Sequence, residues 1–154
     1  MTILSTSSLL VRRDWLNRLR GPFDQRFDMT GGGDTHLLKR LERLGAKMVW
    51  TNDAVVHEHV PISRANVSWI LARRLRIGMS NAQRFKLLDS PDARKFRTMR
   101  ALNYLRDGLG DLPAGLLGGR AGVLWRLCRC AFGLGILLGL AGFRFEPYRR
   151  IEGR

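Results

Sequence analysis

The sequence predicts an α/β protein in which a short mixed sheet with flanking helices is followed by C-terminal helices. Three observations lead to this class. Short segments rich in β-branched and other apolar residues occur at residues 3–11, 46–50 and 54–57, and each is long enough for a strand. Apolar residues at helical spacing begin directly after three consecutive glycines, residues 31–33. Longer helical patterns then fill most of residues 65–106.

The composition is that of a basic protein with enough apolar residues for a core. The 154 residues carry a net charge of +14, and 45% of them are hydrophobic. Such a charge favours an anionic partner: nucleic acid, an anionic membrane face or a phosphorylated ligand. The two cysteines, Cys128 and Cys130, are one residue apart, a spacing that suits neither a disulfide framework nor a zinc site. We therefore expect a reduced, cytosolic setting for them.

The glycine run is the most informative stretch of the first half. A short helix over residues 14–19 is expected to end at Gly21-Pro22, before an aromatic and acidic loop that leads to the glycines. Glycines adopt left-handed backbone angles and let the chain approach a ligand closely. We expect the next helix to run from about Asp34 to Leu44, with backbone N–H groups of its first turn holding the Asp34 carboxylate. Read alone, this pattern also fits an ordinary capped helix start.

The middle of the chain predicts extended structure and then basic helices. A turn at Asn52-Asp53 separates the two later extended segments. Helical patterns run over residues 65–88 and 92–106, and a linker is expected at residues 108–113. We therefore divide the chain into a mixed part at residues 1–90, a basic helix and linker at residues 91–112, and an apolar, glycine-rich helical tail at residues 113–154.

The tail favours contact with a membrane surface. Residues 130–143 carry no charge and are flanked by arginines. As a helix this stretch would rise about 21 Å, which is less than the roughly 30 Å thickness of a hydrocarbon core. An interfacial or re-entrant helix, or a short hairpin with residues 116–127, fits better than one clean span. The alternative is a buried, glycine-rich helix of a soluble domain.

The order of several short motifs resembles a known family. In chain order these are Phe27-Asp28, Thr30-Gly31-Gly32, Asp34-Thr35, Arg40-Leu41, Gly45-Ala46, Val49-Trp50, Asp53-Ala54-Val55-Val56, Glu58, Val60-Pro61, Arg64, Trp69, Arg73-Arg74, Arg76 and Gly78. Together they resemble the second half of a family 2 glycosyltransferase of the GT-A fold, of the bacterial exopolysaccharide, succinoglycan-biosynthesis type. The likeness covers residues 4–78, so it implies that residues 1–90 are the acceptor-side half of a GT-A catalytic domain.

The resemblance implies roles for particular residues. The catalytic aspartate of the family, the general base that deprotonates the acceptor hydroxyl, corresponds to Asp34. Most members have a glutamate directly before it, where this chain has Gly33. Basic residues of the family lie near the donor diphosphate. The substrate-binding residues implied here are Gly31, Gly32, Gly33, Thr35, Glu58, Arg64, Trp69, Arg73, Arg74 and Arg76.

A metal and a second half of the site are also implied. Enzymes of this type hold Mg²⁺ or Mn²⁺ on an acid cluster of the nucleotide-binding half, and His57 or His59 matches a late histidine that helps to hold the metal. The acids before Asp34 are not spaced as such a cluster. We therefore expect a truncated reading frame, or half of a split enzyme completed by a separate chain, that does not turn over alone.

The function implied is sugar transfer from a nucleotide-sugar donor to a glycan or lipid-linked acceptor at the cytoplasmic face of the bacterial inner membrane. The alternative is a non-enzymatic basic protein that binds nucleic acid or an anionic membrane. Nucleic acid is the less favoured partner, because the chain lacks zinc-finger and RNP-type signatures and its basic run has no interleaved aromatic residues.

Overall fold

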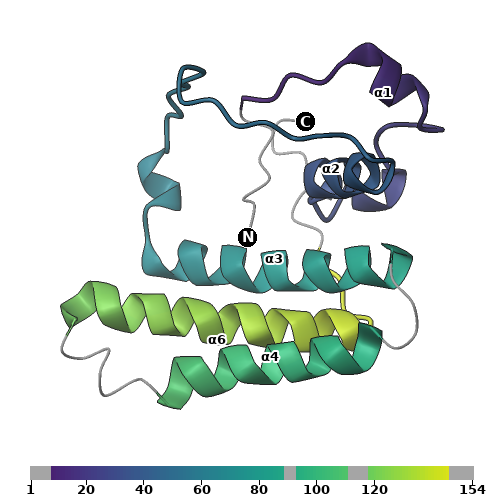
Figure 1. Ribbon diagram of the computed structural model, residues 1–154. Helices are drawn as coiled ribbons and strands as arrows, with labels where there is room; N and C mark the ends of the chain where they lie inside the picture. The colour runs from purple at the N-terminus through teal and green to yellow at the C-terminus, as the bar shows by residue number, and fades with distance from the viewer. Residues whose placement is uncertain (1–7, 89–92, 111–117, 146–154) are drawn as a thin grey trace, which may run out of the picture. The chain divides into compact units, whose positions relative to one another are not determined.

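A computed structural model describes residues 8–88, 93–110 and 118–145, and these residues are largely helical (Figure 1). They divide into two compact units. Residues 8–59 belong to the first unit, and residues 60–145 belong to the second. Each unit has its own small core, so each is described by itself.

The first unit is built around α2 (Gly33–Arg43), which follows the short α1 (Arg13–Asn17) and the 3-10 turn η1 (Gln25–Phe27). The apolar face of α2 supplies its core, because apolar side chains recur at helical spacing on one side of that helix. Its buried members are Leu37, Leu38 and Leu41, packed by Val11, Trp15, Leu16, Leu19 and Ala46. The helix predicted from the sequence after the glycines is therefore present and forms the centre of this unit.

The predicted sheet is wrong: no strand forms within residues 8–88, 93–110 and 118–145. Residues 46–50 and 54–57 have no regular secondary structure, and the predicted bend at Asn52 and Asp53 lies between them. Ala46 packs on the core of α2, but Val49 is 92% exposed and Val55 is 69% exposed, so most of both segments is not packed against an apolar surface. β-branched residues favour strands only where a neighbouring strand and a core face are available. Of the first predicted strand, only residues 8–11 are described, and they are not a strand either.

The second unit contains three long helices: α3 (Val67–Leu88), α4 (Ala93–Gly110) and α6 (Gly119–Ala141). The 3-10 turn η2 (Ile62–Arg64) precedes α3. Figure 1 shows α6 between α3 and α4, and α6 makes most of the contacts in this unit. The core at this junction contains Ala82, Ala101, Ile136 and Leu140. The predicted linker is wrong over residues 108–110, which still belong to α4, and its remaining residues, 111–113, lie outside the described ranges.

Small residues let these helices approach closely. A Cβ atom at Gly135 would lie 2.1 Å from the carbonyl oxygen of Leu75 on α3, and one at Gly139 would lie 2.7 Å from the Cβ of Ala82. On the α4 side, a Cβ at Gly133 would lie 2.8 Å from the carbonyl oxygen of Ala101. These contacts leave no room for side chains, so these three glycines of α6 are required by its packing.

The tail prediction needs one correction. The hairpin alternative is wrong, because α6 is one continuous helix from Gly119 to Ala141. At 23 residues, α6 is long and apolar enough to cross a membrane by length and composition, and 33% of its most apolar stretch is buried. A helix that is apolar on all sides is normally covered on all sides. α3 and α4 leave part of the surface of α6 exposed, including Leu134, which is 46% exposed.

Candidate functional site

The glycine run places Asp34 in the first turn of α2. Gly31 and Gly32 both have positive φ angles, +74° and +96°, and the helix begins at Gly33. Oδ1 of Asp34 accepts hydrogen bonds from the backbone N–H of Thr35 (2.6 Å) and from its hydroxyl (3.3 Å). The carboxylate is thus held by the helix start, as the sequence predicts. Oδ2 of Asp34 accepts no hydrogen bond from any described residue, and Asp34 is partly exposed.

The loop before Asp34 is anchored by buried side chains. Phe27 and Thr30 are 3% and 4% exposed, and the N–H of Gly31 donates to the carbonyl oxygen of Phe27 at 2.8 Å. The ring of Phe27 packs on that of His36, with centroids 4.8 Å apart. These contacts fix the backbone on both sides of the glycines. The position of Asp34 therefore depends on a small core and not on the glycines alone.

An acid and a histidine that the sequence reading missed lie beneath this loop. Asp24 caps η1 and accepts hydrogen bonds from Arg26, at 3.0 Å from the backbone N–H and 2.6 Å from Nη2. The hydrogen bonds from Arg26 lower the pKa of Asp24 to about 2, with the charge of His36 as a further, smaller cause. The same pair raises the pKa of Arg26. Nε2 of the buried His36 lies 3.7 Å from Oδ2 of Asp24.

The signal for this pair is only partly present in the sequence. An aspartate two residues before Arg26 is a local capping pattern that could have been recognised. The approach of His36 to Asp24 depends on how α2 packs on η1, and no spacing rule predicts it.

A second anchor comes from Arg40 on α2. Its Nη1 donates to the carbonyl oxygens of Gly21 (2.8 Å) and Pro22 (3.3 Å). The guanidinium thus ties the turn that follows α1 to the middle of α2. Arg40 was part of the motif series in the sequence, and the structure gives it a positioning role within this unit.

The predicted metal ligands lie on the extended segment that closes the first unit. His57 and His59 are both exposed, as is Glu58 between them, which was predicted to bind substrate. Within the described ranges, no three His, Cys, Asp or Glu side chains lie close enough together to hold a metal ion. The described donors therefore do not fit Mg²⁺ or Mn²⁺, and a metal in the complete site stays a prediction.

The predicted basic residues lie in the second unit. Arg64 is exposed at the end of η2, two residues before Asn66, whose side chain caps α3 by accepting from the N–H of Trp69 at 2.8 Å. Trp69, Arg73 and Arg74 line an open hollow of about 300 Å³ on α3, together with Ile70 and Ile77.

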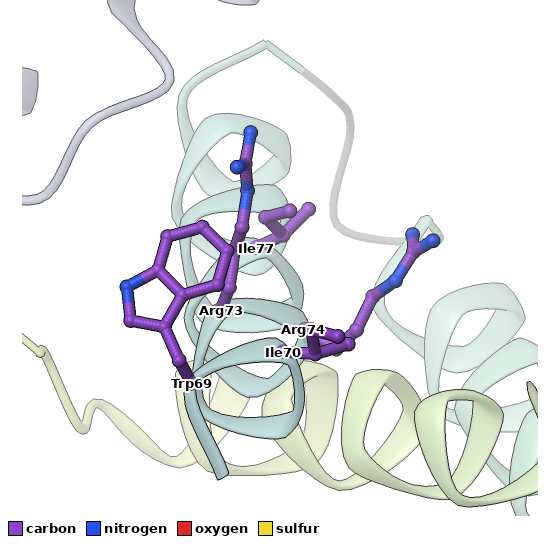
Figure 2. A pocket seen from close by; sticks show the side chains of 5 residues that line it. All are labelled: Trp69, Ile70, Arg73, Arg74 and Ile77. Atoms are coloured by element: carbon purple, nitrogen blue, oxygen red, sulfur yellow. The ribbon is translucent and has the colours of Figure 1, made fainter. Parts of the chain in front are cut away.

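Figure 2 shows the side chain of Arg73 beside the indole of Trp69 and running along α3, whereas Arg74 extends away from the other side of the helix in this view. The guanidinium carbon of Arg73 is 5.1 Å from the centre of the Trp69 ring. This is a cation–π distance, and it holds one guanidinium in place beside an apolar face. Arg76 is partly buried and does not line the hollow. The structure thus brings together three of the predicted basic-site residues: Trp69, Arg73 and Arg74.

Comparison with known proteins gives one partial likeness. No protein-family model matches the chain, and no solved structure matches it. The succinoglycan biosynthesis protein ExoM of Rhizobium meliloti (strain 1021) is 32% identical over 78 residues, which are 51% of this chain and 25% of that protein. The chain thus spans about a quarter of the length of the curated relative it matches. The predicted likeness to a succinoglycan-biosynthesis protein is confirmed over half of the chain, whereas membership of glycosyltransferase family 2 stays a prediction.

Proposed function

We propose that this chain acts in exopolysaccharide synthesis, in the transfer of a sugar from a nucleotide-sugar to a glycan or lipid-linked acceptor. The observation that carries this proposal is the 32% identity with the succinoglycan biosynthesis protein over half of the chain. The geometry of the Asp34 loop supports it, because a partly buried carboxylate with one held oxygen and one open oxygen suits a general base.

In this proposal, Asp34 accepts the proton of the acceptor hydroxyl as the hydroxyl oxygen attacks the anomeric carbon of the donor sugar. The bond to the nucleoside diphosphate breaks, and the diphosphate leaves with its electron pair. Hydrogen bonds from Thr35 to Oδ1 orient the carboxylate so that Oδ2 meets the acceptor. Gly33 has no side chain at the position where related enzymes carry a glutamate, so no second acid stands directly before Asp34.

The arginines of α3 are assigned to the donor diphosphate. Guanidinium groups form paired hydrogen bonds to phosphate oxygens and stabilise negative charge on a leaving group. Arg73 and Arg74 both line the hollow on α3, and the ring of Trp69 lies beside Arg73. These three residues are therefore favoured over Arg64 and Arg76 for this role.

We propose that the sugar transfer takes place at the cytoplasmic face of the bacterial inner membrane. The apolar helix α6 and the net charge of +14 support this location, because an anionic leaflet attracts arginines that flank an apolar surface.

A transfer assay tests the proposal. Purified chain is added to membranes from a strain of the source organism that lacks its gene, and these membranes supply acceptors and partner chains. Radiolabelled nucleotide-sugars are then supplied, and incorporation into lipid-linked glycan is measured. We expect the wild-type chain to restore incorporation and Asp34→Asn to reduce it at least 100-fold, the range expected for loss of a general base.

Two sets of variants make this assay specific. Glu42→Gln removes an exposed acid from the same helix and is expected to leave incorporation unchanged. Arg73→Ala and Arg74→Ala are expected to raise the donor concentration needed for half-maximal transfer more than they lower the maximal rate. Full activity of Asp34→Asn would refute the assignment of the base.

A further inference from the structure

One side of α6 is apolar and is not covered by the other described helices. Gly135 and Gly139 turn one side of α6 toward α3, and Gly133 turns another side toward α4. Leu127 and Leu134 are seven residues apart, so they lie on the same remaining side of the helix. They are 38% and 46% exposed.

The apolar surface continues onto α4. Tyr104 of α4 contacts the ring of Phe132 at one edge of the seam between the two helices. Leu105 lies toward the opposite edge of this seam. Leu102 and Leu109 lie on the same side of α4 as Leu105, further from the seam. The exposed fractions of Leu102 and Leu109 are 47% and 59%. Leu102, Leu109, Leu127 and Leu134 form what we call the leucine strip.

Basic side chains border the leucine strip. Lys95 and Arg106 are exposed and lie on the same side of α4 as Leu102. Arg120 is exposed at the start of α6, and Arg144 is exposed just after its end. An apolar strip with cations at its borders is complementary to a bilayer that has anionic headgroups above an apolar interior.

The packing of α6 is incompatible with α6 crossing a bilayer in this arrangement. Arg126 and Arg129 lie near the middle of the helix, and Arg129 forms an ion pair with Asp107 of α4 at 2.5 Å. The backbone of α3 contacts α6 at Gly78, within five residues of Arg73, Arg74 and Arg76. A spanning α6 would carry these charges into the hydrocarbon, where ionised groups are costly.

We propose that the second unit binds an anionic lipid bilayer through the leucine strip, with α6 parallel to the membrane plane. The leucines enter the boundary between headgroups and acyl chains, and the bordering cations contact the anionic headgroups. This proposal rests on the membrane association in the proposed function and names the surface responsible. Vesicle binding is measured without any sugar transfer. The proposed membrane binding and the proposed function can therefore fail separately.

Co-sedimentation of the full chain with vesicles tests the proposal. The vesicles contain phosphatidylcholine, either pure or with 30% phosphatidylglycerol. We expect binding to the anionic vesicles, and we expect Leu127→Glu/Leu134→Glu to lower the partition coefficient at least 10-fold. Val67→Glu is the matched control, because Val67 is 54% exposed on α3 and lies outside the strip, and it should change binding less than 2-fold.

A second measurement covers the case in which the double variant misfolds. A tryptophan is added at position 134 (Leu134→Trp) or, as a control, at position 67 (Val67→Trp), and quenching by brominated lipids is compared. We expect additional quenching for Leu134→Trp only. Any one of three results would overturn the proposal. The first two are equal quenching at both positions and resistance of the bound chain to carbonate extraction. The third is a double variant that loses self-association but still binds vesicles.

Discussion

The backbone at two glycines determines where the Asp34 carboxylate lies. Gly31 and Gly32 take positive φ angles that other residues adopt only with strain, and α2 starts immediately after them. The resulting first turn presents the N–H of Thr35 to Asp34. These are local rules, so this part of the candidate site could be predicted from the sequence.

The support beneath the loop could not be predicted in the same way. His36 and Phe27 are nine residues apart and meet through the packing of α2 on η1. The contact of His36 with Asp24 also depends on this packing. Tertiary contacts of this kind leave no periodic signal in a single sequence.

The ion pair of Asp24 gives a pH dependence. The hydrogen bonds from Arg26 lower the pKa of Asp24 from 3.8 to about 2, so the folded state favours the ionised carboxyl. The ionised carboxyl of Asp24 stabilises the folded state. This stabilisation is complete above about pH 4 and is lost as the pH falls toward 2. We expect Asp24→Asn to destabilise residues 24–43 by about 1 kcal/mol at pH 6, a value reduced by the exposure of Arg26.

Hydrogen–deuterium exchange at pH 6 and at low pH measures this effect. The difference between wild type and Asp24→Asn should disappear near pH 2. Asp14→Asn is the control, because its ion pair with Arg12 is exposed on both sides and should contribute less than about 0.5 kcal/mol. A pH-independent difference for Asp24→Asn would show that the lost contribution is not ionic.

At the scale of elements, the helices could be predicted and the strands could not. Helices satisfy their own backbone groups, so apolar spacing and breakers locate α2 and α3 well. Strands need partners, and residues 46–57 have none within the part of the chain that the structure describes. Their β-branched residues predicted a sheet because sequence preference does not report whether a neighbouring strand exists.

The packing of α6 on α3 gives a prediction at this scale. A Cβ at position 135 would lie 2.1 Å from the carbonyl oxygen of Leu75, so Gly135→Ala must push the two helices apart. We expect the free energy of unfolding to fall by about 1–3 kcal/mol, even though alanine favours helices. The protection of α3 amides from hydrogen exchange should fall about 10- to 100-fold.

Gly110→Ala is the matched control for this change. A Cβ at position 110 has no heavy atom within 4 Å, and Gly110 ends α4. Protection of α3 should therefore stay within about 2-fold of the wild type. An equal effect of both substitutions would contradict the assigned role of Gly135 in the close approach of α3 and α6.

At the scale of the whole molecule, the predicted site residues fall into two groups. Asp34 and its glycine loop belong to the first unit, and Trp69, Arg73 and Arg74 belong to the second. The sequence predicted both groups because each is local: one is a helix start and the other is a run along one helix. Their common role in sugar transfer is inferred from the partial likeness to a succinoglycan biosynthesis protein.

Exopolysaccharide yield in the source organism tests the central claim most directly. The chromosomal gene is deleted and replaced with wild type, Asp34→Asn or Glu42→Gln, and secreted polysaccharide is weighed and analysed for sugar composition. We predict that deletion lowers the yield, that wild type and Glu42→Gln restore it, and that Asp34→Asn leaves it at the level of the deletion although the chain accumulates normally. Full restoration by Asp34→Asn, or an unchanged yield on deletion, would contradict the proposed function.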